Sequence, residues 1–422
     1  EYGLLLFQME LLDRRTQAAR YQVFETKTEN LRAHFSMLQS PSREAQPLPV
    51  ALLVEPTSRC NMTCVMCARS IPGHRREEEC DLPETFVPLL GRSMRGIQAA
   101  RIQGLGEPLI SSSFVPLMND LESNRVHVVT FNTNGSLMDE KMARFLVEKG
   151  KTFEHFRISF SLDAATQKTY DKIRGKDLGR VLRNIRHLQE YKRKLGVTNP
   201  SVFINMTLSR TNIKDLPKLI RLAHELGAQV ELSNLALDRN YETIRIQKSA
   251  EFLFDYGKEV LTAYPRLFNR YLQMAERLGE RLKVPIHKAG DVNRMEEPPS
   301  RFRALTRLKE IARRRLKSHR PFLNSPDLPL VPHERDPAFE NLPLCLLPWS
   351  QMVISSRGDI SLCCVQGFID HLKNYSSIEE AWNSERICRI REQLSRRVFP
   401  PECETADCTV RRWNTRVCIV HQ

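Results

Sequence analysis

One stretch decides the fold: the apolar run Val50-Ala51-Leu52-Leu53-Val54, and after it Cys60-Asn61-Met62-Thr63-Cys64-Val65-Met66-Cys67. A short apolar run of this kind is typical of a buried strand. The cysteines after it have the spacing CxxxCxxC, and three thiolates can hold three irons of a [4Fe–4S] cube while the fourth iron stays open to a ligand. A structural zinc site normally closes with four ligands. Cys80 is the nearest fourth thiol, so zinc is an alternative, and three unrelated buried cysteines are the least favoured interpretation.

Strand-like and helix-like segments alternate after this stretch. Between the strand-like runs, apolar residues recur at helical spacing, as in Phe114, Leu117, Met118 and Leu121. Such βα units predict a parallel sheet with helices outside, here an α/β fold with a partial (β/α)6 TIM-like barrel. Its functional residues should lie at the carboxyl ends of the strands. The predicted strands are 50–55, 99–104, 127–132, 156–162, 201–207 and 228–233.

The rest of the chain divides by composition. Residues 1–49 predict a helical extension, 50–240 the barrel, and 241–344 a helical and then Pro- and Arg-rich bridge. The last segment, 345–422, predicts an α+β domain in which Ser356-Arg357-Gly358-Asp359 is the turn of a hairpin.

Charge and cysteine usage narrow the class of protein. The net charge of +14 over 422 residues is compatible with nucleic acid, with an anionic small substrate, or with a solvated basic face such as the predicted helix 301–320. Aromatic residues make up only 7% and do not alternate with basic ones, so nucleic acid is the weaker interpretation. No apolar run reaches the roughly 18 residues of a membrane span. The eleven cysteines form two groups with none at 81–344, which predicts metal sites in a reducing compartment, the cytoplasm.

Polar and glycine-rich motifs follow three of the predicted strands. They are Gly104-Leu105-Gly106-Glu107-Pro108, Phe131-Asn132-Thr133-Asn134-Gly135 and Ser159-Phe160-Ser161-Leu162-Asp163. Glycines allow a ligand to approach the backbone, and Glu107 can accept a hydrogen bond from an ammonium group. Each motif alone is also compatible with an ordinary turn.

Together these motifs resemble those of the radical S-adenosylmethionine (SAM) superfamily, over roughly residues 50–235. The matching pieces, in the family's order, are CxxxCxxC at 60–67, GxGEP at 104–108, TNG at 133–135, SLD at 161–163 and Ile173-Arg174-Gly175. The resemblance implies a [4Fe–4S] cluster on Cys60, Cys64 and Cys67, whose open iron is chelated by the amine and carboxylate of SAM.

The resemblance also implies a set of SAM contacts. Met66 stands where the family often has an aromatic residue. The contact with adenine is therefore expected from the main chain of Met66. The implied contacts are Met66 for adenine, Gly106 and Glu107 for the ammonium, Asn134 in the TNG motif, Ser161 and Asp163 for the ribose, and Arg174 for the carboxylate.

The late cysteines resemble a SPASM or shorter twitch extension, which carries auxiliary clusters. Four thiolates suffice for one closed [4Fe–4S] cluster, and the dense cysteine run of a two-cluster domain is missing. We therefore expect one auxiliary cluster, with Cys364 as an alternative to Cys363. The leftover thiols, which are Cys80, Cys388, Cys418 and whichever of Cys363 and Cys364 is not a ligand, are expected to be incidental. The alternative that the resemblance implies is that one of them donates a hydrogen atom to a substrate radical. The predicted auxiliary ligands are Cys345, Cys363, Cys403 and Cys408.

These features predict an enzyme that cleaves SAM reductively and uses the resulting 5′-deoxyadenosyl radical to abstract hydrogen from a substrate. The positive charge favours a small anionic metabolite, such as a sugar, nucleotide or antibiotic precursor, that is oxidised, epimerised or joined to another group. A peptide-modifying maturase is the alternative, and a non-catalytic iron–sulfur protein the remote one. An external one-electron reductant, such as flavodoxin or ferredoxin, is the expected partner.

Overall fold

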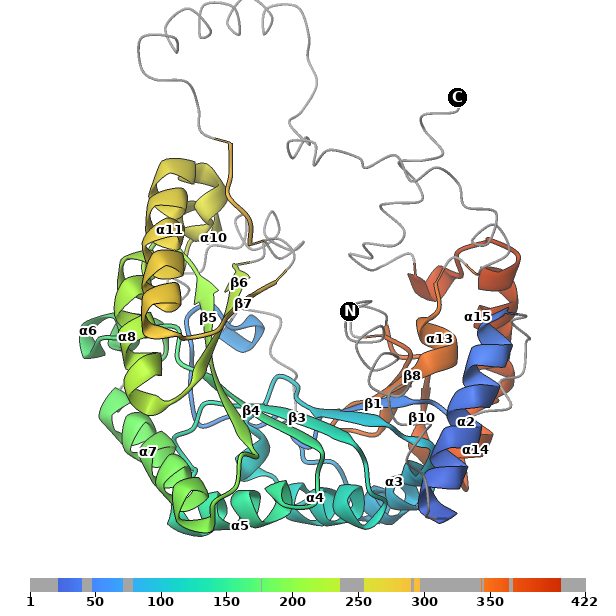
Figure 1. Cartoon of the computed structure of the whole chain (residues 1–422). Helices are drawn as coiled ribbons and strands as arrows, with labels where there is room; N and C mark the ends of the chain where they lie inside the picture. Colours follow the sequence, from blue (N-terminus) through green and yellow to red (C-terminus); the bar gives the residue numbers. More distant parts are fainter. Residues whose placement is uncertain are drawn as a thin grey trace, which may run out of the picture.

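The computed structural model describes residues 22–39, 48–70, 79–175, 177–235, 254–289, 292–296, 343, 345–363 and 367–403. One curved sheet organises them, in the strand order β10-β9-β8-β1-β2-β3-β4-β5-β6-β7 (Figure 1). From β8 to β7 all neighbouring strands are parallel, and β9 and β10 continue the sheet antiparallel. The strands are β1 (Ala51–Val54), β2 (Ala99–Ile102), β3 (Val128–Thr133), β4 (His155–Ser161), β5 (Ser201–Leu208), β6 (Gln229–Asn234), β7 (Ile286–Lys288), β8 (Gln351–Ile354), β9 (Asp359–Ser361) and β10 (Asp370–His371).

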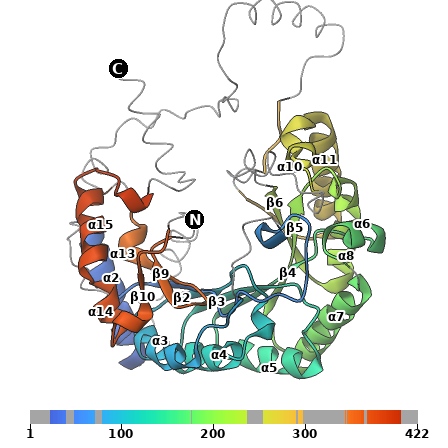
Figure 2. The same cartoon turned by 180° about the vertical axis from the view of Figure 1, so that it is seen from behind.

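Helices follow the convex side of the sheet, as the βα pattern predicts (Figure 1). The helices of the barrel are α3 (Val87–Ser93), α4 (Phe114–Ser123), α5 (Glu140–Gly150), α6 (Gln167–Ile173), α7 (Leu178–Leu195), α8 (Leu216–Leu226), α10 (Tyr256–Glu259) and α11 (Pro265–Leu282). At the other end of the sheet lie α2 (Gln22–Gln39), α13 (Leu347–Ser350), α14 (Ile378–Trp382) and α15 (Glu385–Ser395), which both views show side by side (Figures 1 and 2).

The partial barrel and its six strands are confirmed, each strand within a few residues of its predicted bounds. Three features of the sheet were not predicted, one of which is the two-residue strand β10 beside β9. The short strand β7 lies in the segment interpreted as a bridge. The predicted C-terminal hairpin forms as β8 and β9, but β8 also pairs in parallel with β1 and thus extends the barrel's own sheet.

The two faces of the sheet differ in chemistry. On β3 the pattern alternates, and Val129 and Phe131 are fully buried while Thr130 and Asn132 are half-buried. Phe131 packs edge-on against Phe114 of α4, with ring centroids 5.3 Å apart, so the apolar side chains point outward to the helices. The polar ones therefore point to the concave side. The lumen of this open barrel is lined by polar side chains that solvent reaches, unlike the filled interior of a closed TIM barrel.

Candidate active site

Cys60, Cys64 and Cys67 line one cavity of about 320 Å³ at the carboxyl ends of the strands. Their loop follows β1 and is held by local hydrogen bonds, because Cys67 N and Ser70 Oγ both donate to Cys64 O, at 3.0 and 2.8 Å. Val65 N donates to Ile173 O at 2.9 Å, which joins the loop to the end of α6. The structure thus brings Cys60, Cys64 and Cys67 together.

The chemistry of these thiols fits an electropositive group. Burial raises the pKa of Cys60 and raises the pKa of Cys64 to about 11, so bare thiolates are disfavoured there. Iron would supply the missing positive charge. Among the described residues, no three His, Cys, Asp or Glu side chains converge as they would on a single metal ion. The fit to a cluster rests on the shared cavity and on the thiol chemistry.

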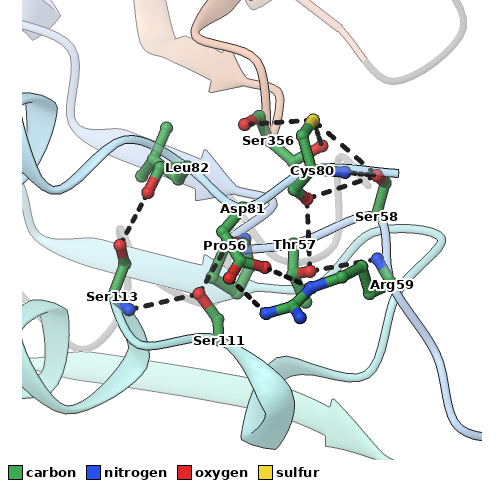
Figure 3. Close-up of polar contacts among 10 residues, drawn as sticks. All are labelled: Pro56, Thr57, Ser58, Arg59, Cys80, Asp81, Leu82, Ser111, Ser113 and Ser356. Carbon is green, nitrogen blue, oxygen red and sulfur yellow. Dashed lines mark hydrogen bonds and ion pairs between the residues drawn. The ribbon is translucent and has the colours of Figure 1, made fainter. Parts of the chain in front are cut away.

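The base of the cysteine loop is fastened by residues 79–82, which run antiparallel to 56–59 (Figure 3). Leu82 N donates to Pro56 O and Ser58 N to Cys80 O, both at 2.9 Å. The carboxylate of Asp81 accepts from Arg59, the residue before Cys60, through Nε at 3.0 Å and also through Nη2. This contact fixes the point from which the cysteine loop departs.

Gly106 and Glu107 line the cavity beside the cysteines. A Cβ at Gly106 would lie 2.2 Å from Thr57 O, so only glycine lets the two loops approach so closely. Glu107 is 2% exposed and accepts from Thr133 Oγ1 at 2.6 Å and from Asn134 N at 2.7 Å. Burial raises the pKa of Glu107 above its ordinary value. The positive charge of Arg174 acts on Glu107 from a distance, but no cation forms an ion pair with it in the described part of the chain, so an ammonium ligand would complete its surroundings.

Asn134 lies between the cysteine loop and the end of β3. Its Nδ2 donates to Asn61 Oδ1 at 2.9 Å and lies 4.0 Å from Cys60 Sγ, and its Oδ1 accepts from Ser136 N at 2.9 Å. Asn134 lines the cavity, but its amide is already engaged in holding the loop.

Asp163 and Arg174 form a buried ion pair with each other. Arg174 Nε donates to Asp163 Oδ2 at 2.6 Å, and Thr207 N donates to Asp163 Oδ1, also at 2.6 Å. Arg174 Nη1 lies 3.6 Å from Cys64 Sγ. Burial lowers the pKa of Arg174, but Asp163 and the Cys64 sulfur together outweigh burial and raise it. Arg174 lines the cavity, whereas the Asp163 carboxylate lies behind it, engaged by Arg174 and the main chain.

Ser161 and Met66 also line the cavity. Among the described residues, no partner engages the Ser161 hydroxyl, which leaves it available to a ligand. The Met66 carbonyl accepts from Tyr256 OH at 2.8 Å, and the Met66 side chain packs against Leu235 and Tyr256. This apolar corner suits a planar ring.

Several lining residues belong to no predicted contact set. Gln103 directly follows β2, and Asn132 and Thr207 lie in β3 and β5. The alternation of polar and apolar residues along these strands was the signal for them. Arg69 also lines the cavity, and its Nη2 pairs with Glu79. Its Nη1 is buried with no hydrogen-bond partner within the described residues.

The late cysteines are only partly described. Cys345 precedes α13, Cys363 follows β9, and Cys403 ends the 3₁₀ helix Pro401–Cys403. Gln351 Nε2 donates to Leu362 O at 3.0 Å and so fixes the residue next to Cys363. The eight described cysteines form no disulfide. The predicted ligand Cys408, its companions Cys364 and Cys418, and the predicted basic helix 301–320 lie outside the described residues.

The model of the radical SAM superfamily matches residues 54–223, the strands and loops that build this cavity. The chain belongs to the radical SAM superfamily. A second model, the SPASM iron–sulfur cluster-binding domain, matches residues 345–409. These matches confirm the expected cofactors: SAM, the [4Fe–4S] cluster that binds it, and auxiliary iron–sulfur chemistry in the SPASM region. That the auxiliary clusters number one stays a prediction.

Relatives of this radical SAM protein differ in what their names describe. It is 29% identical over 188 residues to the tungsten-containing aldehyde ferredoxin oxidoreductase cofactor-modifying protein of Pyrococcus furiosus, covering 44% of this chain and 51% of that one. It is 27% identical over 192 residues to the PqqA peptide cyclase of Gluconobacter oxydans, covering 44% and 49%. The chain therefore spans about half the length of the curated relatives it matches.

The fold has a solved counterpart in Streptococcus suis SuiB bound to S-adenosylmethionine, with a TM-score of 0.54 and 17% identity over 91% of this chain and 77% of that one. In the described part of the chain, no helix is both long and apolar enough to cross a membrane.

Proposed function

We propose that this radical SAM protein abstracts a hydrogen atom from a small anionic metabolite. One observation carries the proposal: a single cavity joins three thiols to a buried carboxylate without a counter-cation and to an unengaged hydroxyl. A pure electron carrier needs the thiols but has no use for the other groups. The cavity therefore supports a catalytic role over a non-catalytic iron–sulfur protein.

The residues take distinct roles in this proposal. Cys60, Cys64 and Cys67 hold the cluster, and Glu107, with the main chain at Gly106, receives the methionyl ammonium. When bound, the cluster and SAM supply reductive cleavage of the sulfonium and a 5′-deoxyadenosyl radical.

The remaining residues orient SAM and keep water away from it. Ser161 donates to or accepts from a ribose hydroxyl, because its own hydroxyl has no other partner in the described residues. Asp163 acts through Arg174, whose guanidinium it fixes beside Cys64, and Asn134 holds the cysteine loop. The corner of Met66, Leu235 and Tyr256 receives the adenine and excludes water.

Electrons enter from an external one-electron reductant, such as flavodoxin or ferredoxin. In the proposal, one auxiliary cluster lies on Cys345, Cys363, Cys403 and Cys408, with Cys364 as an alternative to Cys363. A cluster held there would supply a site able to take up or return one electron during oxidation, epimerisation or bond formation. Two cubes correspond to about eight irons per chain. Iron analysis of reconstituted protein should give this number, and a value of about four or about twelve would contradict it.

Peptide modification is the second candidate, because the PqqA peptide cyclase and the mycofactocin maturase MftC are among the relatives. Other relatives, the cofactor-modifying protein and the probable GTP 3′,8-cyclases, have names that support a small substrate to the same degree. The net charge of +14 favours the small anionic class.

The test is anaerobic incubation of the reconstituted chain with SAM and dithionite, with 5′-deoxyadenosine and methionine as the readout. Wild type should form both products, and Cys60→Ala should form neither. Cys388→Ala, which removes a buried thiol of α15 outside the cavity, is the matched control and should retain the activity. The proposal is wrong if wild type forms no product, or if Cys60→Ala and wild type are equally active.

The substrate class is tested by adding small-molecule and peptide fractions from the source organism separately. A small anionic substrate predicts that product formation rises with the small-molecule fraction and that anion-exchange resin removes the stimulating compound. Stimulation by the peptide fraction alone would instead establish the maturase function.

A further inference from the structure

The lumen of the barrel carries two arginines directly beneath the SAM cavity. Arg101 of β2 pairs in register with Thr130 of β3, and Thr130 pairs with Arg157 of β4. All three are half-buried on the concave side. Two positions after Arg101 and Thr130 stand Gln103, just past the end of β2, and Asn132 of β3, and both line the cavity. Since side chains two apart on a strand share a face, Arg101 lies in the next layer down. Arg157 is in register with that layer through Thr130 and lies four positions before Ser161, the β4 residue that lines the cavity.

Arg157 is engaged by its surroundings. It pairs with Glu231 of β6, its Nε donates to Ser159 Oγ at 2.9 Å, and its guanidinium lies 3.8 Å from the centroid of the Phe203 ring. Its side chain is nevertheless 25% exposed, so solvent and solutes reach it. Burial lowers the pKa of Arg157, and the positive charge of Arg101 lowers it further. The positive charges of Arg101 and Arg157 therefore repel each other across the lumen.

Arg101 has no such partners. Within the described residues no carboxylate, carbonyl or hydroxyl accepts a hydrogen bond from it, and no ring stacks on it. Arg101, Arg157 and Glu231 thus leave an excess of one positive charge in the layer. Nearby, Asn205 of β5 pairs in register with Glu231, and its Oδ1 is buried without a partner in the same set of residues. Asn205 also pairs in register with the cavity-lining Ser161 of β4, so it lies above the arginine layer, and the layer itself holds an unused cation.

We propose that Arg101, beside Arg157, binds an oxyanion of the substrate, a carboxylate or a phosphate, in the lumen beneath the SAM cavity. This inference rests on the proposed function, because it places the substrate below the site that generates the radical. A planar guanidinium matches both oxyanions with two parallel hydrogen bonds. SAM does not need Arg101, since neither Arg101 nor Arg157 lines the cavity that receives it.

The test measures anion binding to the reconstituted full-length protein with SAM present and no reductant. Inorganic phosphate and succinate are titrated separately at constant ionic strength by calorimetry. Phenylglyoxal labelling, mapped by mass spectrometry, reports whether either anion protects Arg101. The comparison of phosphate with succinate distinguishes the two oxyanions. Tighter binding of phosphate indicates a phosphate group on the substrate, and tighter binding of succinate indicates a carboxylate.

Three variants sharpen the result. Arg101→Gln should weaken anion binding about tenfold or more, as expected for loss of a charge-assisted hydrogen bond. Arg101→Lys should restore most of it. Arg180→Gln removes an equal charge from the exposed face of α7 and should leave binding unchanged.

The inference is overturned if neither anion binds, if neither protects Arg101 from labelling, or if Arg101→Gln binds as wild type does. Its failure can be told from failure of the proposed function. Arg101→Gln should still form 5′-deoxyadenosine with dithionite alone, so absence of that product in wild type would count against the function and not against the anion site.

Discussion

Glu55 connects the GxGEP loop, proposed to bind SAM, to the SPASM region. Its substitution is the sharpest test of how the two parts communicate. Glu55 follows β1 and is 5% exposed. Its Oε1 accepts from Leu105 N, in the GxGEP loop, at 2.7 Å. Its Oε2 accepts from Ser356 N and Ser356 Oγ, in the β8–β9 turn, both at 3.1 Å. Gly104 leaves room for it, because a Cβ there would lie 2.2 Å from Glu55 Cγ.

The magnitude follows from these three bonds. A hydrogen bond to a charged group contributes about 1.5–3 kcal/mol, and removing one side of a buried charged network costs about 3–5 kcal/mol. Glu55→Ala leaves Leu105 N and Ser356 N without an acceptor, so we expect it to destabilise both loops by about 3–5 kcal/mol.

Glu55→Gln should act on one loop only. The amide oxygen can still accept from Leu105 N, while the amide nitrogen faces Ser356, whose hydroxyl can reverse and accept. Only Ser356 N then loses its acceptor, at a cost of about 1–3 kcal/mol. The β8–β9 turn should loosen while the GxGEP loop keeps its position.

The assay is amide hydrogen exchange of the reconstituted protein by mass spectrometry, which reports local opening without requiring global unfolding. Both variants should speed exchange in peptides covering 351–361, about 10- to 100-fold for Glu55→Gln. Only Glu55→Ala should also speed exchange at 103–107 and weaken SAM binding, about tenfold. Glu148→Gln, at a surface pair with Lys151 on α5, is the control and should change neither segment. Unchanged exchange in the β8–β9 turn of both Glu55 variants would refute the coupling.

Three further outcomes are expected. Gly106→Ala should abolish SAM binding in equilibrium dialysis while the far-ultraviolet circular dichroism stays native, because its Cβ would lie 2.2 Å from Thr57 O. Asp163→Asn should reduce SAM cleavage more than 10-fold, because it leaves Arg174 buried without its carboxylate. Asparagine tolerates the left-handed φ of 55° at this position. Activity equal to that of wild type would show that the ion pair is dispensable. Burial lowers the pKa of His34 to about 4, so its contribution to stability is complete above pH 6.5 and is lost as the pH falls to about 4. His34→Leu should remove that part of the acid destabilisation, up to about 1.4 kcal/mol per pH unit, measured as the wild-type-minus-variant difference in urea unfolding.

Local patterns account for the strands that the sequence predicts. In β4 the apolar residues Phe156, Ile158 and Phe160 alternate with polar ones, so the strand, its bounds and its two faces follow from neighbouring residues. The pairing of β8 with β1 depends on residues about 300 positions apart, and no local pattern encodes it. β7 has three residues and two exposed side chains, which is too little pattern to distinguish it from a loop.

In the candidate site too, the sequence predicts some features and cannot predict others. Motif spacing located the three cysteines and Glu107, because each motif ends one strand and parallel strands end at one edge. It could not show that Asp163 and Arg174 engage each other, since each was matched to SAM separately. Nor could it place Tyr256, which reaches Met66 across 190 positions. Contacts between side chains of different motifs require the folded geometry.

That geometry explains which ligand charge the cavity is missing. Arg174 is already neutralised by Asp163, so it is not an open cation. Two other groups in the described part of the cavity lack a partner. Glu107 is a buried carboxylate without a paired cation, and Arg69 Nη1 is a buried donor without an acceptor. A cation alone would satisfy the first, and an anion alone the second. A zwitterion satisfies both at once. The amino-acid end of SAM is such a zwitterion, and in the proposal the cysteines that line the same cavity would hold the iron to which its amine and carboxylate would bind.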